Sequence, residues 1–130
     1  MGADAGSTRA LLDKLGVKSG ARVSVLGVRD EVFLDQIRSR GADVSSRPRR
    51  DSDLVFVLID RPEGLPRLKA LEGSIKRSGA IWAVFPKGRK DIREVDLIAA
   101  GPAAGLVDNK VVRFSETHTA LRFVVPLRRR

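Results

Sequence analysis

The polar residues best suited to chemistry in this sequence directly follow its apolar runs, where predicted strands should end. In open α/β sheets, ligands collect at the carboxyl ends of the strands, so we expect these residues to share one edge of a sheet. The candidate anion-binding edge consists of Gly27, Arg29, Asp60, Arg61, Lys87, Arg89 and Lys90.

Phosphate or carboxylate binding is the chemistry that this edge predicts. Five of its seven residues are basic. Helices predicted to begin near Asp30 and Asp91 would direct backbone amides toward the same edge. Both predicted caps are anionic, however, and would compete with an anionic ligand. The alternative is a set of surface loops with ordinary helix caps and solvated cations.

Asp60 and His118 are the residues whose types could serve acid–base catalysis. Asp60 ends the most apolar run, but Arg61 can pair with it. His118 lies between two threonines in a predicted turn without an evident nucleophile, and Glu116 could hydrogen-bond it. We therefore assign no catalytic residue, and the sequence favours a protein that is not an enzyme.

The composition excludes several other kinds of site. The chain has no cysteine and a single histidine, so disulfides, thiolate metal sites and multi-histidine metal sites are excluded. No apolar run approaches the roughly 18 residues needed to span a bilayer. The first residues lack the basic-then-apolar order of a secretory signal. We expect no metal, no membrane association and a cytoplasmic location.

The formal net charge of +9 raises nucleic acid or another polyanion as a partner. Aromatic residues do not alternate with the basic ones, as they do in proteins that stack single-stranded bases. A solvated basic surface without a polyanionic partner is the alternative. The basic residues form three groups: Arg47, Arg49 and Arg50; Lys87, Arg89 and Lys90; Arg128, Arg129 and Arg130.

Strands and helices alternate along most of the chain. Val32, Phe33, Ile37 and Leu34 have the spacing of one helix face. Trp82 is expected in the core, and residues 108–110 in backbone capping or an inter-element hydrogen bond. Four helices are expected. The first runs from a cap at Ser7 or Thr8 to Leu15, and the second from a cap at Asp30 to Gly41. The third covers residues 65–78 and ends at Gly79, and the fourth runs from a cap at Asp91 to about Ala100, where GPAAG ends it. The expected strands are 22–27, a weak one over 42–46, 53–60, 80–86, 106–114 and 120–127.

This order predicts one α/β domain over residues 1–130, a three-layer Rossmann-like fold with a mostly parallel sheet. The last two strands are joined by too few residues for a crossover, so they must form an antiparallel pair. Residues 1–7 and 127–130 are expected to be disordered.

The sequence resembles the class I S-adenosylmethionine-dependent methyltransferases. LLDKLGVKSGARVSVLG is similar to the segment that leads into their first strand. DLVFVLID and SGAIWAVFPKG resemble their fourth and fifth strands, and residues 105–127 resemble their terminal strand pair. Residues 9–126 are more closely similar to a family of short bacterial proteins of unknown function, through GLVDNKV and ALRFVV. The resemblance implies a truncated methyltransferase-like fold.

Two departures argue against the cofactor that this resemblance implies. Those enzymes place an acid and a Gly-x-Gly-x-Gly turn after strand one, whereas here Gly27 is followed by Val28 and Arg29. They also place an acid that binds the ribose after strand two. The weak strand over 42–46 is followed by only about six residues, too few for a parallel crossover of a dozen or more. It must be a stub, reversed or outside the sheet, and we expect no bound cofactor and no methyl transfer.

The sequence therefore favours a non-catalytic binding domain whose partner is a protein or an anionic ligand. An uncovered edge near the first strand would favour a homodimer over a monomer. Nucleic-acid binding through the basic surface is one alternative. A small enzyme acting on a phosphorylated or carboxylated metabolite, through Lys87 and Arg89, is the other.

Overall fold

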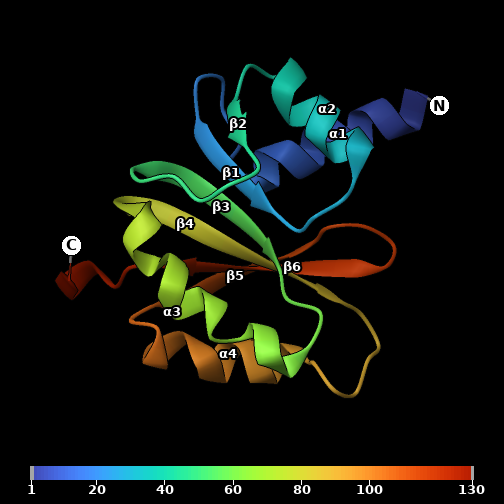
Figure 1. Cartoon of the computed structure of the whole chain (residues 1–130). Helices are drawn as coiled ribbons and strands as arrows, with labels where there is room; N and C mark the ends of the chain where they lie inside the picture. Colours follow the sequence, from blue (N-terminus) through green and yellow to red (C-terminus); the bar gives the residue numbers. More distant parts are fainter. Residues whose placement is uncertain (1, 130) are drawn as a thin grey trace.

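A six-stranded sheet forms the centre of the protein, with the strand order β2-β1-β3-β4-β6-β5 (Figure 1). The computed structural model describes residues 2–129. The strands are β1 Arg22–Leu26, β2 Asp43–Ser45, β3 Ser52–Leu58, β4 Ile75–Pro86, β5 Val107–Arg113 and β6 His118–Val124.

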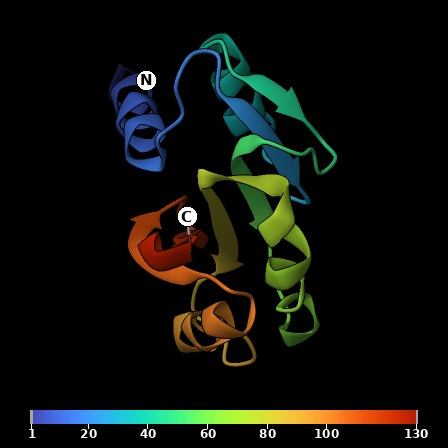
Figure 2. The ribbon, with the colours of Figure 1, turned by 90° about the vertical axis from the view of Figure 1, so that its left-hand side faces the viewer.

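Helices cover both faces of this sheet, as Figures 1 and 2 show. One face packs against α1 (Gly2–Leu15) and α2 (Glu31–Ser39). The other face packs against α3 (Arg67–Leu71) and α4 (Glu94–Ala103). The predicted three-layer α/β fold is therefore confirmed.

The strand directions also agree with the sequence. The strands β1, β2, β3 and β4 run parallel, while β6 runs antiparallel to both of its neighbours, β4 and β5. The β5–β6 hairpin turn is shorter than the predicted SETHT segment, because His118 and Thr119 already pair with Pro86 and Phe85 of β4.

The core consists of two clusters separated by the sheet, since successive strand residues point to opposite faces. On the α1–α2 face, the ring of Phe33 meets Phe56 and Phe114 edge-on, with centroid distances of 5.2 and 4.9 Å. Trp82 is fully buried in the same cluster, as predicted. Its indole nitrogen donates to the carbonyl of Leu15, 3.0 Å away, and so ties α1 to the central strand.

Two side chains cap the carboxyl end of α1, whose last carbonyls have no partners within the helix, and a third binds the turn that follows. Besides Trp82, the Lys110 ammonium donates to the Lys14 carbonyl at 2.8 Å. Arg40 donates to the carbonyl of Val17, in the turn just after the helix, at 3.1 Å. The bond from Lys110 is the inter-element hydrogen bond expected for residues 108–110.

Both ends of the chain differ from the prediction. Helix α1 begins at Gly2, before the cap predicted at Ser7 or Thr8, in a stretch containing alanines that favour helix. Leu127–Arg129 form a short 3-10 turn, held by a 2.7 Å hydrogen bond from Arg129 to the Gly105 carbonyl. Met1 and Arg130 lie outside the described residues.

The helix predicted over residues 65–78 is wrong in its second half. Helix α3 ends at Leu71, a 3-10 turn follows over Glu72–Ser74, and β4 begins at Ile75. Gly79 lies inside this strand instead of ending a helix. A Cβ atom there would come within 2.9 Å of the carbonyl oxygens of Ser52 and Asp53, so the two backbones approach too closely for a side chain.

Two helix details also needed correction. Asp91 does not cap α4; the helix begins after Arg93, whose amide donates to Asp96 at 2.9 Å, and it continues through Pro102 in its last turn. Val32 does not belong to the buried face of α2, since 64% of its surface is exposed. Asp30 does cap α2, accepting from the Phe33 amide at 3.0 Å, and Phe33 and Ile37 are buried as predicted.

The second strand is a stub, one of the three alternatives that the sequence left open. Strand β2 has three residues, which pair parallel with Arg22, Val23 and Ser24 of β1. Because β2 is so short, residues 46–51 are enough to return the chain to the start of β3. The helix, strand and helix that a full crossover would add are absent here. The edge beside β1 is therefore occupied by β2, and self-association stays a prediction.

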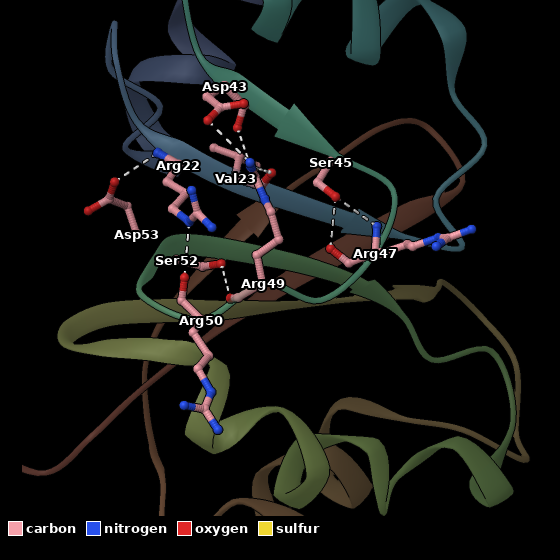
Figure 3. Close-up of polar contacts among 9 residues, drawn as sticks. All are labelled: Arg22, Val23, Asp43, Ser45, Arg47, Arg49, Arg50, Ser52 and Asp53. Atoms are coloured by element: carbon pink, nitrogen blue, oxygen red, sulfur yellow. Dashed lines mark hydrogen bonds and ion pairs between the residues drawn. The ribbon is translucent and has the colours of Figure 1, made fainter.

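Arg49 holds this short crossover against the sheet (Figure 3). Its guanidinium donates to the carbonyls of Val23 in β1, at 3.0 Å, and Asp43 in β2, at 2.7 Å. It also pairs with the Asp43 carboxylate at 3.1 Å. Its backbone carbonyl accepts from the Ser52 hydroxyl at 2.6 Å, so this arginine connects the loop to three strands.

Candidate functional site

A cavity of about 760 Å³ lies at the carboxyl ends of the strands. Its lining comes from the β1–α2 turn, the ends of β3 and β4, and the β5–β6 turn. The apolar part of the wall is formed by Val28, Val32, Leu58, Val84 and Phe114. The polar part is formed by Gly27, Arg29, Asp30, Glu31, Asp60, Ser115, Thr117 and His118.

The turn after β1 gives this cavity its floor. Gly27 has a φ of +79°, a conformation that glycine adopts without strain. The chain then enters α2, whose first turn is capped by Asp30. Val28 turns into the core and is 8% exposed, whereas Arg29 is exposed at the rim.

The structure divides the predicted anion-binding edge between two cavities. Gly27, Arg29 and Asp60 line the large one. Lys87, Arg89 and Lys90 line a separate cavity of about 410 Å³, beside the start of α4. Arg61 lines neither of these two cavities. The seven residues therefore share one edge of the sheet, as expected, without lining a common cavity.

Several charges at this edge are already paired. Arg61 lies 3.4 Å from Asp60, the pairing that the sequence suggested. Arg89 donates twice to Asp91, at 3.0 and 2.6 Å, and these hydrogen bonds lower the pKa of the Asp91 carboxyl. Among the described side chains, Arg29, Lys87 and Lys90 have no carboxylate partner at this edge.

The large cavity is not basic. Three carboxylates, Asp30, Glu31 and Asp60, line it together with one guanidinium, that of Arg29. This balance does not suit a small inorganic anion. It suits a ligand whose contacts are mainly apolar and that carries few charges.

His118 sits at the rim in a local network of hydrogen bonds. Its Nδ1 lies 2.8 Å from the Thr117 hydroxyl, so its neighbour is Thr117 and not Glu116 as suggested. The Ser115 hydroxyl accepts from the His118 amide at 3.1 Å and lies 3.3 Å from the Thr117 hydroxyl. These bonds join residues of one tight turn, and among the described residues no third group orients the ring as a nucleophile–base pair requires.

A smaller cavity of about 250 Å³ at the end of β2 was missed by sequence reasoning. It shares Gly27, Val28 and Arg29 with the large cavity and adds Arg38, Ser45 and Ser46. The two serines directly after β2 are the sequence signal that could have found it.

The end of β2 does not fit the methyltransferase cofactor. A ribose diol is held there by a carboxylate, but the residues around this small cavity offer guanidinium and hydroxyl groups instead. Within the described residues, no group of three or more acidic or histidine side chains could hold a metal ion. No described helix is long and apolar enough to cross a membrane.

Solved structures identify the architecture. A methyltransferase from Aquifex aeolicus that depends on S-adenosylmethionine superposes with a TM-score of 0.70, at 14% identity, over 91% of this chain and 89% of that one. The chain has a methyltransferase-like fold. Magnesium protoporphyrin IX methyltransferase from Synechocystis, with bound S-adenosylmethionine, gives a TM-score of 0.66 at 15% identity, over 93% of this chain and 77% of that one.

A third neighbour of this methyltransferase-like chain is the ribosomal protein L11 methylase from Lactobacillus delbrueckii, with a TM-score of 0.67 at 10% identity, over 91% of this chain and 76% of that one. Such low identities establish the fold alone. Neither a scan of protein-family models nor a search of curated proteins gives a match. The similarity to a short bacterial family therefore stays a prediction.

Proposed function

We propose that the protein is a non-catalytic binding domain that holds a small, mainly apolar ligand in the large cavity. The observation that carries this proposal is the cavity itself. Its volume of about 760 Å³ falls within the roughly 300–1,000 Å³ typical of small-molecule sites. Apolar walls with a few convergent polar groups are the usual lining of such sites.

The ligand that fits best has an apolar or aromatic body and one polar head. The body would contact Val28, Leu58 and Phe114, and the head would reach Arg29 or the hydroxyls beside His118. Binding is favoured over catalysis because Asp60 is paired with Arg61 and His118 is engaged within its own turn. S-adenosylmethionine is a poor candidate, since the group expected to bind its ribose is missing from the end of β2.

A melting screen with metabolites, including S-adenosylmethionine, nucleotides and coenzyme A, tests the proposal. The variant Val32→Trp places a large ring at the mouth of the cavity, at a position that is already 64% exposed. Val95→Trp is the matched control, because Val95 is 56% exposed in the first turn of α4 and does not line this cavity.

Ligands that stabilise the wild-type protein should stabilise Val95→Trp equally and Val32→Trp much less, because the ring occupies their space. Hits that stabilise Val32→Trp as strongly as the wild type would place the ligand elsewhere. A screen that yields no ligand sensitive to Val32→Trp would count against the proposal.

A further inference from the structure

Arg122 is a half-buried cation that lines neither cavity at the carboxyl ends of the strands. It lies in β6, on the face covered by α1, and its register neighbours are Trp82 in β4 and Lys110 in β5. Among the side chains that the structure describes, none forms an ion pair or hydrogen bond with its guanidinium. A guanidinium carries five donors, which water must satisfy here unless a ligand does.

Two cavities meet at this arginine, near the amino ends of β1 and β3. One has a volume of about 360 Å³ and the other of about 270 Å³. Gly16, Lys18, Leu54 and Arg122 line both of them. They are therefore two lobes of one depression, and Arg122 belongs to the wall that the lobes share.

The charges around this depression are strongly unbalanced. Lys14, Lys18, Lys110 and Arg122 line it. Its two carboxylates are already engaged by groups on other elements. Asp13 pairs with Arg40 at 2.7 Å. Asp53 pairs with Lys76 at 2.9 Å and accepts from the Arg22 amide at 2.8 Å.

The carboxyl end of α1 binds only one of these cations, Lys110. A helix carries a partial negative charge at this end, which attracts nearby cations. The carbonyls of Lys14 and Leu15, however, already accept from Lys110 and Trp82. Arg122 and the ammonium groups of Lys14 and Lys18 are left at a hollow whose lining has more cations than carboxylates, and such an excess of positive charge concentrates anions from solution.

We propose that this depression binds an anion with two linked phosphate groups, one in each lobe, with Arg122 donating to both. Guanidinium suits this task because its planar fork of donors matches phosphate oxygens. Lys18 and Lys14 supply the remaining positive charge, and Lys110 is fixed by its bond to α1. The depression is independent of the cavity at the carboxyl ends of the strands, so it is a second site.

Titration with inorganic pyrophosphate at constant ionic strength tests this site. Trp82 is the only tryptophan and neighbours Arg122, so its single indole NMR signal reports on binding. Arg122→Gln removes the guanidinium charge. Arg113→Gln makes the same charge change at an exposed position on β5 that does not line the depression, and is the matched control.

The wild type and Arg113→Gln should show saturable shifts of the indole signal, and Arg122→Gln should bind about tenfold more weakly or worse, as expected when charge-assisted hydrogen bonds are lost. Circular dichroism would verify that each variant is folded. No saturable binding, or equal weakening in both variants, would overturn the proposal.

A single-stranded DNA oligonucleotide in a parallel titration separates the two sources of linked phosphates. DNA that displaces pyrophosphate and loses affinity in Arg122→Gln would support the site and identify nucleic acid as the source of phosphate. DNA that binds equally to Arg122→Gln, while pyrophosphate does not bind at all, would show a diffuse basic surface and refute the proposal.

Discussion

Arg49 holds the short β2–β3 connection against the sheet, where a full crossover would add further elements. It is one of three arginines that the sequence presents as a basic group, yet only 22% of its side chain is exposed and its donors bind two strands. Its Nε is buried without a partner, so its stabilising effect comes from the two terminal nitrogens. The sequence could not reveal this role, because the carbonyls it binds belong to residues 26 and 6 positions away.

Replacing Arg49 should destabilise the protein without affecting ligand sites. Arg49→Ala should lower the free energy of unfolding by about 1–3 kcal/mol, because two strand carbonyls lose a charge-assisted donor. Arg49→Lys should not restore it fully, since one guanidinium nitrogen binds both carbonyls while the other binds the Asp43 carboxylate, and a single ammonium cannot take both places. Urea denaturation measures both effects.

Arg47→Ala serves as the control for that loop. Arg47 is exposed, and its described bonds involve only its backbone, so the free energy of unfolding should change by less than about 0.5 kcal/mol. Equal stability of Arg49→Ala and Arg47→Ala would show that the guanidinium contributes nothing.

At the scale of elements, the spacing of apolar residues predicted which side chains are buried, but it did not always predict the backbone conformation. Leu65, Leu68, Leu71 and Ile75 have helical spacing and all pack into the core under α3 and α4. Ile75 reaches that core from a strand, because the chain turns through Glu72–Ser74. A periodic pattern reports which side chains are buried and does not fix the backbone between them. The closeness of Gly79 to β3 depends on tertiary contact, which a single sequence does not reveal.

Gly79→Ala tests this corrected boundary. Because the added methyl group would collide with the carbonyls of Ser52 and Asp53, the free energy of unfolding should fall by about 1–3 kcal/mol. Gly73→Ala is the matched control, since nothing lies within 4 Å of a Cβ there. Chemical denaturation that gives the two variants equal stability would contradict the close approach of β3 and β4.

For the molecule as a whole, the sheet could be predicted and the sites only in part. The alternation of strands and helices in the sequence predicted the three layers, and the short connection between β5 and β6 predicted that these two strands pair antiparallel. The sequence also placed Gly27 and Asp60 at the edge that holds the large cavity. It could not show that Arg89 is paired with Asp91 or that Arg122 has no partner among the described side chains, because side-chain partners depend on how separate elements meet.

Asp53 couples the protein's stability to pH, because it joins three strands at the amino ends of the sheet. Burial alone would raise the pKa of the Asp53 carboxyl. The hydrogen bonds from the Arg22 amide and the Lys76 ammonium outweigh this effect, so the pKa lies below its ordinary value of 3.8. A carboxyl whose pKa is lowered by folding stabilises the protein above its unfolded pKa. That stabilisation is lost as the pH falls below about 3.8 and the folded carboxyl takes up a proton.

Asp53→Asn should therefore be less stable than the wild type near neutral pH, and this difference should shrink as the pH falls below about 3.8. Urea denaturation at several pH values measures the difference. Asp51→Asn, at an exposed position in the preceding loop, should track the wild type throughout. A difference between Asp53→Asn and the wild type that is constant with pH would exclude this carboxyl as a source of acid sensitivity.

The three-residue length of β2 affects where the folded protein could begin to aggregate. Exposed strand borders can template incoming chains, and proteins blunt them by making the outermost strand very short. With only Asp43–Ser45 in that position and Arg49 already bound to the Asp43 carbonyl, this border offers few free backbone groups to an incoming chain. We therefore expect that aggregation of the folded protein, where it occurs, begins at the seven-residue β5 on the opposite border.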